Sequence, residues 1–302
     1  MPIKPVYRNV LFGLAALVIA AAAYAQSPDS TCSQSANRIP QRSAHARGAG
    51  EFVDAVVGMS EPERDLAIRR ELVAGNVPSF LRQLQPVTLS TQSANGKTVR
   101  LTLCVLSDYL SLGDDADFLL IPMSFDTALS VAASLGFTLP TRRMVDIIYR
   151  QSTVRLTPQP LPAGDQMRST DYYVLHNSMV QKQRAAAGAA PGALTAGHKK
   201  DLVLSARLWR QPGRVAIYGW HRGVDAPIQP LSTVHGASYA DYSHGVRLVS
   251  TLVFVNGEQR SIFDVLADAL LAPLLSDEGP FPQAAELRAA VSNGSLGWHA
   301  SQ

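Results

Sequence analysis

The sequence predicts a single α+β domain, with a mixed or mainly antiparallel sheet flanked by helices, behind an N-terminal signal peptide. Three observations lead to this fold class. The chain has 302 residues, 46% of them hydrophobic and 17% charged, a globular composition that excludes a disordered or collagen-like chain. Strand-like segments fall into two groups with helix-like segments between and after them. No internal repeat is visible, and the length suits one domain.

Residues 1–25 have the pattern of a secretory signal peptide. Lys4 and Arg8 precede an apolar run over 10–24, and Ala23-Tyr24-Ala25 supplies a small-residue cleavage site. An uncleaved membrane anchor is the alternative, although the run is short and rich in alanine. We expect a flexible leader over 26–50, because it is polar and aperiodic, and the α+β domain over 51–302. The predicted location is the periplasm or the exterior of the cell.

The charge balance argues against a nucleic-acid partner. The formal net charge is +3, but this includes Lys4 and Arg8 of the signal peptide, so the mature chain is nearly neutral. No second apolar stretch reaches spanning length, so we expect no stable membrane span after cleavage.

The chain has 2 cysteines, Cys32 and Cys104. In an oxidising compartment they are predicted to form one disulfide bond. A catalytic thiol is the alternative. It is disfavoured because Cys104 lies in an apolar strand-like run with no histidine beside it.

Capping residues and turns delimit the expected elements. Ser60 and Glu63 form a capping box for a helix that ends at Gly75. Further helices are predicted from Ser124 or Asp126 to 136, from 141, over 171–184, over 262–275 and just before 293, with a helical turn over 78–84. Strands are predicted over 87–91, 99–106, 118–122, 202–208, 215–220 and 245–255, with turns at 95–96 and 256–257.

Missing motifs exclude several enzyme classes. The sequence contains no GxSxG, GxxxxGK[ST], GxGxxG, HExxH or CxxC motif, so no nucleotide or redox cofactor is expected. No glutamate occurs between Glu71 and Glu258. A glycosidase with paired carboxylates would therefore need two aspartates or a glutamate from near one end of the chain.

Five of the 7 histidines lie between 176 and 244, at the ends of predicted elements. His198 and Asp201 enclose two lysines just before a strand, where the aspartate could orient the histidine. The segment 235–247 is the densest polar stretch, and it carries Asp241 and His244. A solvated basic turn and a self-bonded polar loop are the respective structural alternatives.

These segments define the candidate site. Catalytic roles are assigned to His198, Asp201, Asp241, His244 and Arg247. Substrate-binding roles are assigned to Trp220, Tyr239, Tyr242 and Asn177. If a metal is bound, the ligands are drawn from His198, His221, His235 and His244, with zinc as the expected ion.

Convergent His and Asp groups are what the activation of water requires, with zinc or with a histidine as general base. The sequence therefore predicts a secreted hydrolase of a cell-envelope or extracellular polymer, of the peptidoglycan or polysaccharide class. A further enzymatic reaction that these residues allow is elimination from an acidic polysaccharide. The alternative of another class is a non-catalytic exported protein that binds sugar or peptide. Catalysis predicts that the His198/Asp201 and Asp241/His244 pairs face one cavity.

Overall fold

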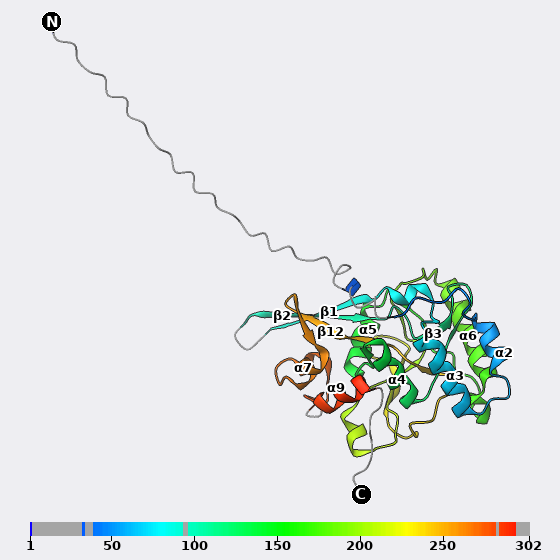
Figure 1. Cartoon of the computed structure of the whole chain (residues 1–302). Helices are drawn as coiled ribbons and strands as arrows, with labels where there is room; N and C mark the ends of the chain where they lie inside the picture. Colours follow the sequence, from blue (N-terminus) through cyan, green and yellow to red (C-terminus); the bar gives the residue numbers. More distant parts are fainter. Residues whose placement is uncertain (2–31, 34–38, 93–95, 282–283, 294–302) are drawn as a thin grey trace.

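Two larger β-sheets and the helices around them share a large hydrophobic core in the computed structural model. Figure 1 shows the arrangement of these elements. The structure describes residues 1, 32–33, 39–92, 96–281 and 284–293. The architecture is mixed α+β, as predicted. The predicted signal peptide beyond Met1, residues 26–31 and 34–38 of the predicted leader, and Asn95 of the predicted turn lie outside the described residues.

The larger sheet is antiparallel throughout. Its strands are β1 (Gln85–Gln92), β2 (Thr98–Val105), β12 (Val249–Val255) and β13 (Glu258–Ser261) in that order, with β5 (Phe137–Thr138) also paired to β12. The β1–β2 hairpin has Leu89 opposite Leu101, and every second residue of β2 from Leu101 is buried. This alternation places one face of the hairpin on the core.

The smaller sheet carries four of the predicted site residues, namely Asp201, Trp220, His221 and His244. Its strands are β10 (Pro227–Ser232), β9 (Ile217–His221), β8 (Lys200–Leu202) and β11 (His244–Gly245) in that order. β11 runs parallel to β8, with His244 opposite Lys200 and Gly245 opposite Asp201. This register brings the two predicted His/Asp segments side by side. Two-stranded pairs are β3 (Ser111–Gly113) with β4 (Phe118–Leu120) and β6 (Val154–Arg155) with β7 (Thr195–Ala196).

Helices cover the sheets at both ends of the molecule (Figure 1). The α-helices are α2 (Ala49–Ala55), α3 (Glu61–Val73), α4 (Phe125–Leu135), α5 (Arg142–Gln151), α6 (Thr170–Ala186), α7 (Ile262–Ala267), α8 (Ala272–Leu275) and α9 (Ala284–Asn293). The 3₁₀ turns are η1 (Ser79–Arg82), η2 (Asp165–Arg168) and η3 (Ala206–Arg210). In Figure 1, α2, α3 and α6 lie at one end, and α7 and α9 lie near the end of β12.

The capping residues mark the helix boundaries as predicted. The Ser60 amide donates to Glu63 at the start of α3. Ser124 accepts from the Thr127 amide at the start of α4, and Gly136 ends that helix in the left-handed region at φ +78°. Thr141 caps α5 in the same way as Ser124 caps α4. Each cap satisfies backbone groups that a helix leaves unpaired at its ends.

Three predicted elements are wrong in their extent. The strand over 202–208 ends at Leu202, because Ser205 accepts from the Arg207 amide and starts a 3₁₀ turn. The helix over 262–275 breaks into α7 and α8 where the Asp268 carboxylate accepts from the Leu270 and Leu271 amides. The strand over 245–255 divides between both sheets, since Gly245 pairs with β8 and Val249 begins β12.

The predicted disulfide bond is confirmed: Cys32 is bonded to Cys104 on β2, across a sequence separation of 72. Both cysteines are buried, and the described end of the predicted leader also packs on the domain. Ile39 is buried in the core and Arg42 donates to Asn76. None of the helices that the structure describes has both the length and the apolar character needed to cross a bilayer.

Candidate functional site

Ten titratable side chains lie together in the interior, where β2, α6, β8 and β11 meet. We call them the buried polar cluster. All are at most 2% exposed except Arg184, which is 7% exposed. The members are Asp108, Tyr109, His176, Arg184, His198, Lys199, Asp201, Asp241, His244 and Arg247. Because charged groups are costly to bury, such a cluster persists only when it is paired internally or used.

Asp108 holds one end of the cluster. Its carboxylate accepts from Arg184 of α6 and lies 3.2 Å from Nε2 of His198. Burial alone would raise the pKa of Asp108, but His198, Arg184 and Arg247 together hold it below its ordinary value. Burial also lowers the pKa of His198, against the attraction of Asp108. The predicted orientation of His198 by Asp201 is therefore replaced by a contact with Asp108.

Asp201 instead accepts a hydrogen bond of 2.8 Å from the Tyr109 hydroxyl. The Arg247 guanidinium lies 4.5 Å from the Tyr109 ring centre and donates to the carbonyls of Leu106 and Thr195. Burial raises the pKa of Asp201 to about 6. Arg247 therefore ties β2, β7 and the end of β11 together.

Lys199 occupies the middle of the cluster. Its Nζ donates to the Tyr242 carbonyl at 2.5 Å, and burial lowers its pKa to about 7. His176 of α6 packs against the Tyr242 ring at 5.1 Å between ring centres. Neither ring nitrogen of His176 has a hydrogen-bond partner among the described residues, and burial lowers its pKa.

A turn brings Asp241 and His244 together. The His244 amide donates to the Asp241 carbonyl at 3.0 Å. The Asp241 carboxylate accepts from the Ser243 amide and hydroxyl at 2.7 and 2.5 Å. Nε2 of His244 lies 3.8 Å from Oδ2 of Asp241.

The charge states of this pair follow from its surroundings. Burial lowers the pKa of His244 to about 4, against the attraction of Asp241. Burial works in the opposite direction on Asp241, but His244 and Ser243 hold the pKa of Asp241 below its ordinary value. At pH 7 the pair therefore consists of a carboxylate and a neutral imidazole.

Tyr239 connects this pair to the surface. Its hydroxyl donates to Oδ2 of Asp241 at 3.2 Å, and its ring lies edge-on to His244 at 5.7 Å. The half-buried His235 stacks on the Tyr239 ring, with 4.0 Å between the ring centres. Burial and the neighbouring Asp241 raise the pKa of Tyr239 to about 12, so that its hydroxyl keeps its proton at neutral pH.

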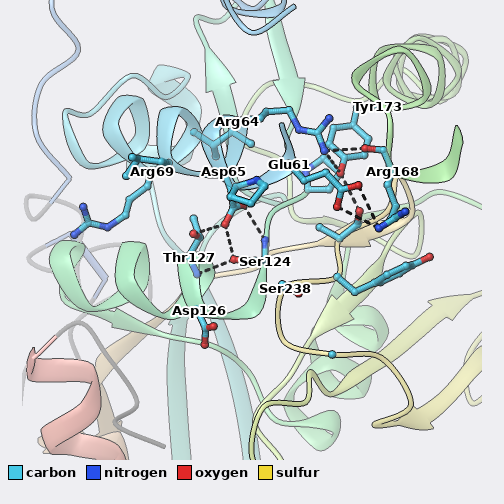
Figure 2. Close-up of a pocket in the computed structure, with 17 residues that line it drawn as sticks. Glu61, Arg64, Asp65, Arg69, Ser124, Asp126, Thr127, Arg168, Tyr173 and Ser238 are labelled. Atoms are coloured by element: carbon cyan, nitrogen blue, oxygen red, sulfur yellow. Dashed lines mark hydrogen bonds and ion pairs between the residues drawn. The ribbon is translucent and has the colours of Figure 1, made fainter. Parts of the chain in front are cut away.

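Tyr239 also lines a pocket of about 450 Å³ (Figure 2). On one side of the pocket, Asp65 of α3 accepts from Ser124 and Thr127 at the start of α4. One helical turn earlier on α3, Glu61 pairs with Arg168 of η2. Figure 2 shows Asp65 above Ser124 and Thr127, with Glu61 and Arg168 to the right and with Arg64 and Tyr173 at the top of the view. The sequence analysis did not assign the residues of α3 or α4 to a site.

Other predicted site residues lie in separate surroundings. Nε2 of His221 lies 3.1 Å from Asp146 of α5, and its ring stacks on Tyr149. Trp220 is 6% exposed and has a positive φ of 56°, so little of its ring is open to a substrate. Asn177 bonds to the backbone of β4 at Leu120 and Phe118.

Tyr242 is buried too, and its hydroxyl accepts from the Leu161 amide at 2.7 Å. The structure therefore places Tyr239, alone of the four predicted substrate-binding residues, in the wall of the described pocket.

The four histidines proposed as metal ligands are not gathered at one point. His198 faces Asp108, His221 faces Asp146, and His235 stacks on Tyr239. Within the described ranges, no group of three or more His, Cys, Asp or Glu side chains is arranged to hold a metal ion. The four histidines therefore do not form a zinc-binding donor set within the described residues.

Sequence reasoning missed Asp108, Tyr109 and Arg184. The first two follow the β2 strand directly, and polar residues at the end of an apolar strand were the available signal. Arg184 stands 76 residues from Asp108 in the chain, so nothing local indicates their pairing.

Comparisons with protein-family models, with curated proteins and with solved structures found no match to this chain. The interpretation of the site therefore depends on its own geometry.

Proposed function

We propose that the protein is an exported hydrolase of a cell-envelope or extracellular polymer, of the peptidoglycan or polysaccharide class, acting at the pocket beside Tyr239. The observation that carries the proposal is Tyr239, which lines the pocket and whose hydroxyl donates to Asp241, with His244 beside that carboxylate. This is a path for a proton from the pocket to a buried acceptor pair.

In the proposed step, a water molecule in the pocket gives a proton to the Tyr239 oxygen as it attacks the scissile bond. The tyrosine hydroxyl passes its own proton to Asp241 at the same time, so Tyr239 ends as it began. The bond to the leaving group then breaks, and Asp241 returns the proton through Tyr239 to the leaving oxygen or nitrogen atom, which completes the hydrolysis. His244, whose Nε2 lies 3.8 Å from the Asp241 carboxylate, is neutral at pH 7 and completes the buried surroundings of that acceptor. Because the pKa of Tyr239 is raised to about 12, its hydroxyl is protonated at neutral pH. The phenol therefore passes a proton on and does not act as a general base by itself.

The pocket suits a short part of a polar polymer. Its volume of about 450 Å³ lies within the range of small-molecule sites. Acidic and basic side chains both line it, namely Glu61, Asp65, Asp126, Arg64, Arg69 and Arg168. This mixture favours a ligand with many hydrogen-bonding groups over an apolar one. The disulfide bond supports a periplasmic or extracellular location.

The test compares Tyr239→Phe with Tyr218→Phe. Both substitutions remove a hydroxyl that donates to a carboxylate, but the Tyr218 hydroxyl donates to Asp146 outside the pocket. The assay measures release of soluble fragments from purified peptidoglycan and from a panel of polysaccharides. We expect Tyr239→Phe to lower turnover by about 10²-fold, the usual size of a lost proton-transfer group, and Tyr218→Phe to leave it unchanged.

Equal turnover of Tyr239→Phe and the wild type would overturn the assignment of the relay. Binding of a polymer without any release of fragments would instead support the alternative, a non-catalytic exported binding protein. The discriminating observation is therefore turnover and not affinity.

A further inference from the structure

The wall of the pocket contains one ion pair that is open to solvent. Nη1 of Arg168 lies 3.2 and 3.4 Å from the two carboxylate oxygens of Glu61. Their side chains are 39% and 42% exposed. An exposed pair of this kind contributes little to stability, on the order of 1 kcal/mol or less, so another carboxylate can replace Glu61 at small cost.

The neighbouring arginines are held more firmly. Arg64 is buried, and its guanidinium donates to Thr170, to the Arg168 carbonyl and to the Tyr173 hydroxyl. Nε of Arg69 donates to Ser130 of α4, on the far side of α3 from Arg168 in Figure 2. Arg168 is therefore the pocket arginine best placed to exchange its partner for a ligand.

Arg168 also lies close to the proposed reaction centre. Its guanidinium carbon is 6.0 Å from the centre of the Tyr239 ring, and both residues line the same pocket. A ligand group bound to Arg168 is consequently held beside the Tyr239 ring, which both lines the pocket and carries the hydroxyl bonded to Asp241. Arginine binds carboxylates with paired, charge-assisted hydrogen bonds, which fix orientation as well as position.

We propose that Arg168 binds a carboxylate group of the substrate, and that Glu61 occupies this position in the free protein. The inference deepens the proposed function and rests on it, because it names the substrate class for the same pocket: a polymer whose units carry free carboxylates next to the bond that is cut. Glu61 acts as an internal competitor, and Arg168 as the residue that selects acidic over neutral units.

The experiment measures binding, so that its outcome does not depend on turnover. Titration by NMR or calorimetry at pH 7 compares N-acetylmuramic acid with N-acetylglucosamine, which lacks the lactyl carboxylate. A second arm compares D-alanyl-D-alanine with its C-terminal amide. The two arms separate a carboxylate on a sugar from one on a peptide. The wild type is expected to bind the acidic member of at least one pair about tenfold more tightly.

Two variants of the ion pair should act in opposite directions. Arg168→Gln is expected to abolish the preference for the acidic ligand. Glu61→Gln is expected to tighten binding of the acidic ligand by about threefold and to leave the neutral ligand unchanged, because the competitor is removed. Arg47→Gln breaks an exposed pair with Glu71 outside the pocket, and it serves as the matched control with no effect.

If Arg168→Gln keeps the preference, or if neither acidic ligand is preferred by the wild type, the inference is wrong. The Tyr239→Phe variant separates this failure from failure of the proposed function. A preference that survives in Tyr239→Phe supports the binding role of Arg168 even where no hydrolysis is found. Hydrolysis without the preference would support only the proposed function.

Discussion

Lys199 has the most unusual surroundings of any single residue in the buried polar cluster. It is buried, and the carboxylates of Asp241 and Asp108 attract its ammonium group and raise its pKa. Even so, burial lowers its pKa to about 7, against about 10.4 for a lysine in the unfolded chain. The side chain is consequently neutral in much of the folded population at mildly alkaline pH, and its titration is linked to folding.

The stability of the protein should rise with pH between about 7 and 10. In that window the unfolded chain binds the Lys199 proton and the folded chain does not, so unfolding takes up a proton and becomes less favourable as the pH rises. Below pH 7 both states hold the proton and this slope vanishes. We expect a rise of about 1 kcal/mol per pH unit, measured by urea unfolding at pH 7, 8, 9 and 10.

Lys199→Met should flatten this slope, while Lys182→Met, which removes an exposed lysine of α6, should leave it intact. An unchanged slope in Lys199→Met would assign the effect to another group. The window above pH 7 is chosen because Asp201, with a pKa raised to about 6, and His244, with a pKa lowered to about 4, act in opposite directions below it. Asp201 lowers stability as the pH rises toward 6, and His244 raises it.

Among the elements, α3 and α4 are joined by one carboxylate. Asp65 accepts from the Ser124 amide at 3.0 Å, from the Ser124 hydroxyl at 2.5 Å and from the Thr127 hydroxyl at 2.5 Å. Asp65→Ala should destabilise the fold by about 2 kcal/mol, since it leaves these donors at the start of α4 without their acceptor. Asp126→Ala, an exposed change in the same turn, should cost under about 1 kcal/mol.

Chemical denaturation of both variants at pH 7 measures the difference. Similar midpoints for Asp65→Ala and Asp126→Ala would contradict the joining role of Asp65. Both residues line the pocket, but only Asp65→Ala is expected to lower stability strongly. A loss of activity in both variants would therefore come from the pocket, and a loss in Asp65→Ala alone would come from lowered stability.

Elements whose ends are marked by nearby capping residues could be predicted from the sequence. Elements whose ends depend on contacts with distant segments of the chain could not. Ser60 with Glu63, and Ser124 with Gly136, lie within a few residues of the helix ends that they cap. The break at Asp268 was also local in cause, but the apolar pattern of 262–275 outweighed it in the prediction. The division of 245–255 between two sheets depends on β8 and β2, which come from far earlier in the chain.

The same distinction holds for the candidate site. The polar segment 235–247 contains Tyr239, Asp241 and His244, and a turn keeps these residues close together in the structure. The pocket wall that faces Tyr239 comes from α3 and α4, which carry no signal of that proximity in the sequence. The charge pairing of Asp108 with Arg184 depends equally on tertiary packing.

At the scale of the whole molecule, the buried charges balance. The cluster contains three permanent or partial cations, Arg184, Lys199 and Arg247, and three carboxylates, Asp108, Asp201 and Asp241. Its histidines have lowered pKa values and remain neutral near pH 7. Replacing one partner of such a set leaves an uncompensated buried charge, so each of these six residues is a poor choice for testing function alone. Tyr239 and Arg168, at the surface of the cluster and of the pocket, are better choices.

The disulfide bond connects the start of the described chain to the centre of the larger sheet. Cys32 and Cys104 are 72 residues apart, and closing a loop of that length restricts the unfolded chain strongly. The double variant Cys32→Ala/Cys104→Ala should therefore lose about 2–4 kcal/mol of stability, measured by urea unfolding without reductant. Wild type with its disulfide reduced keeps both sulfur atoms in the core but lacks the cross-link. A similar loss of stability in this sample would show that the loss comes from the missing cross-link and not from the packing of the sulfur atoms. Midpoints equal to that of the oxidised wild type would mean that the loop is already constrained by the packing of residues such as Ile39, and that the disulfide adds little.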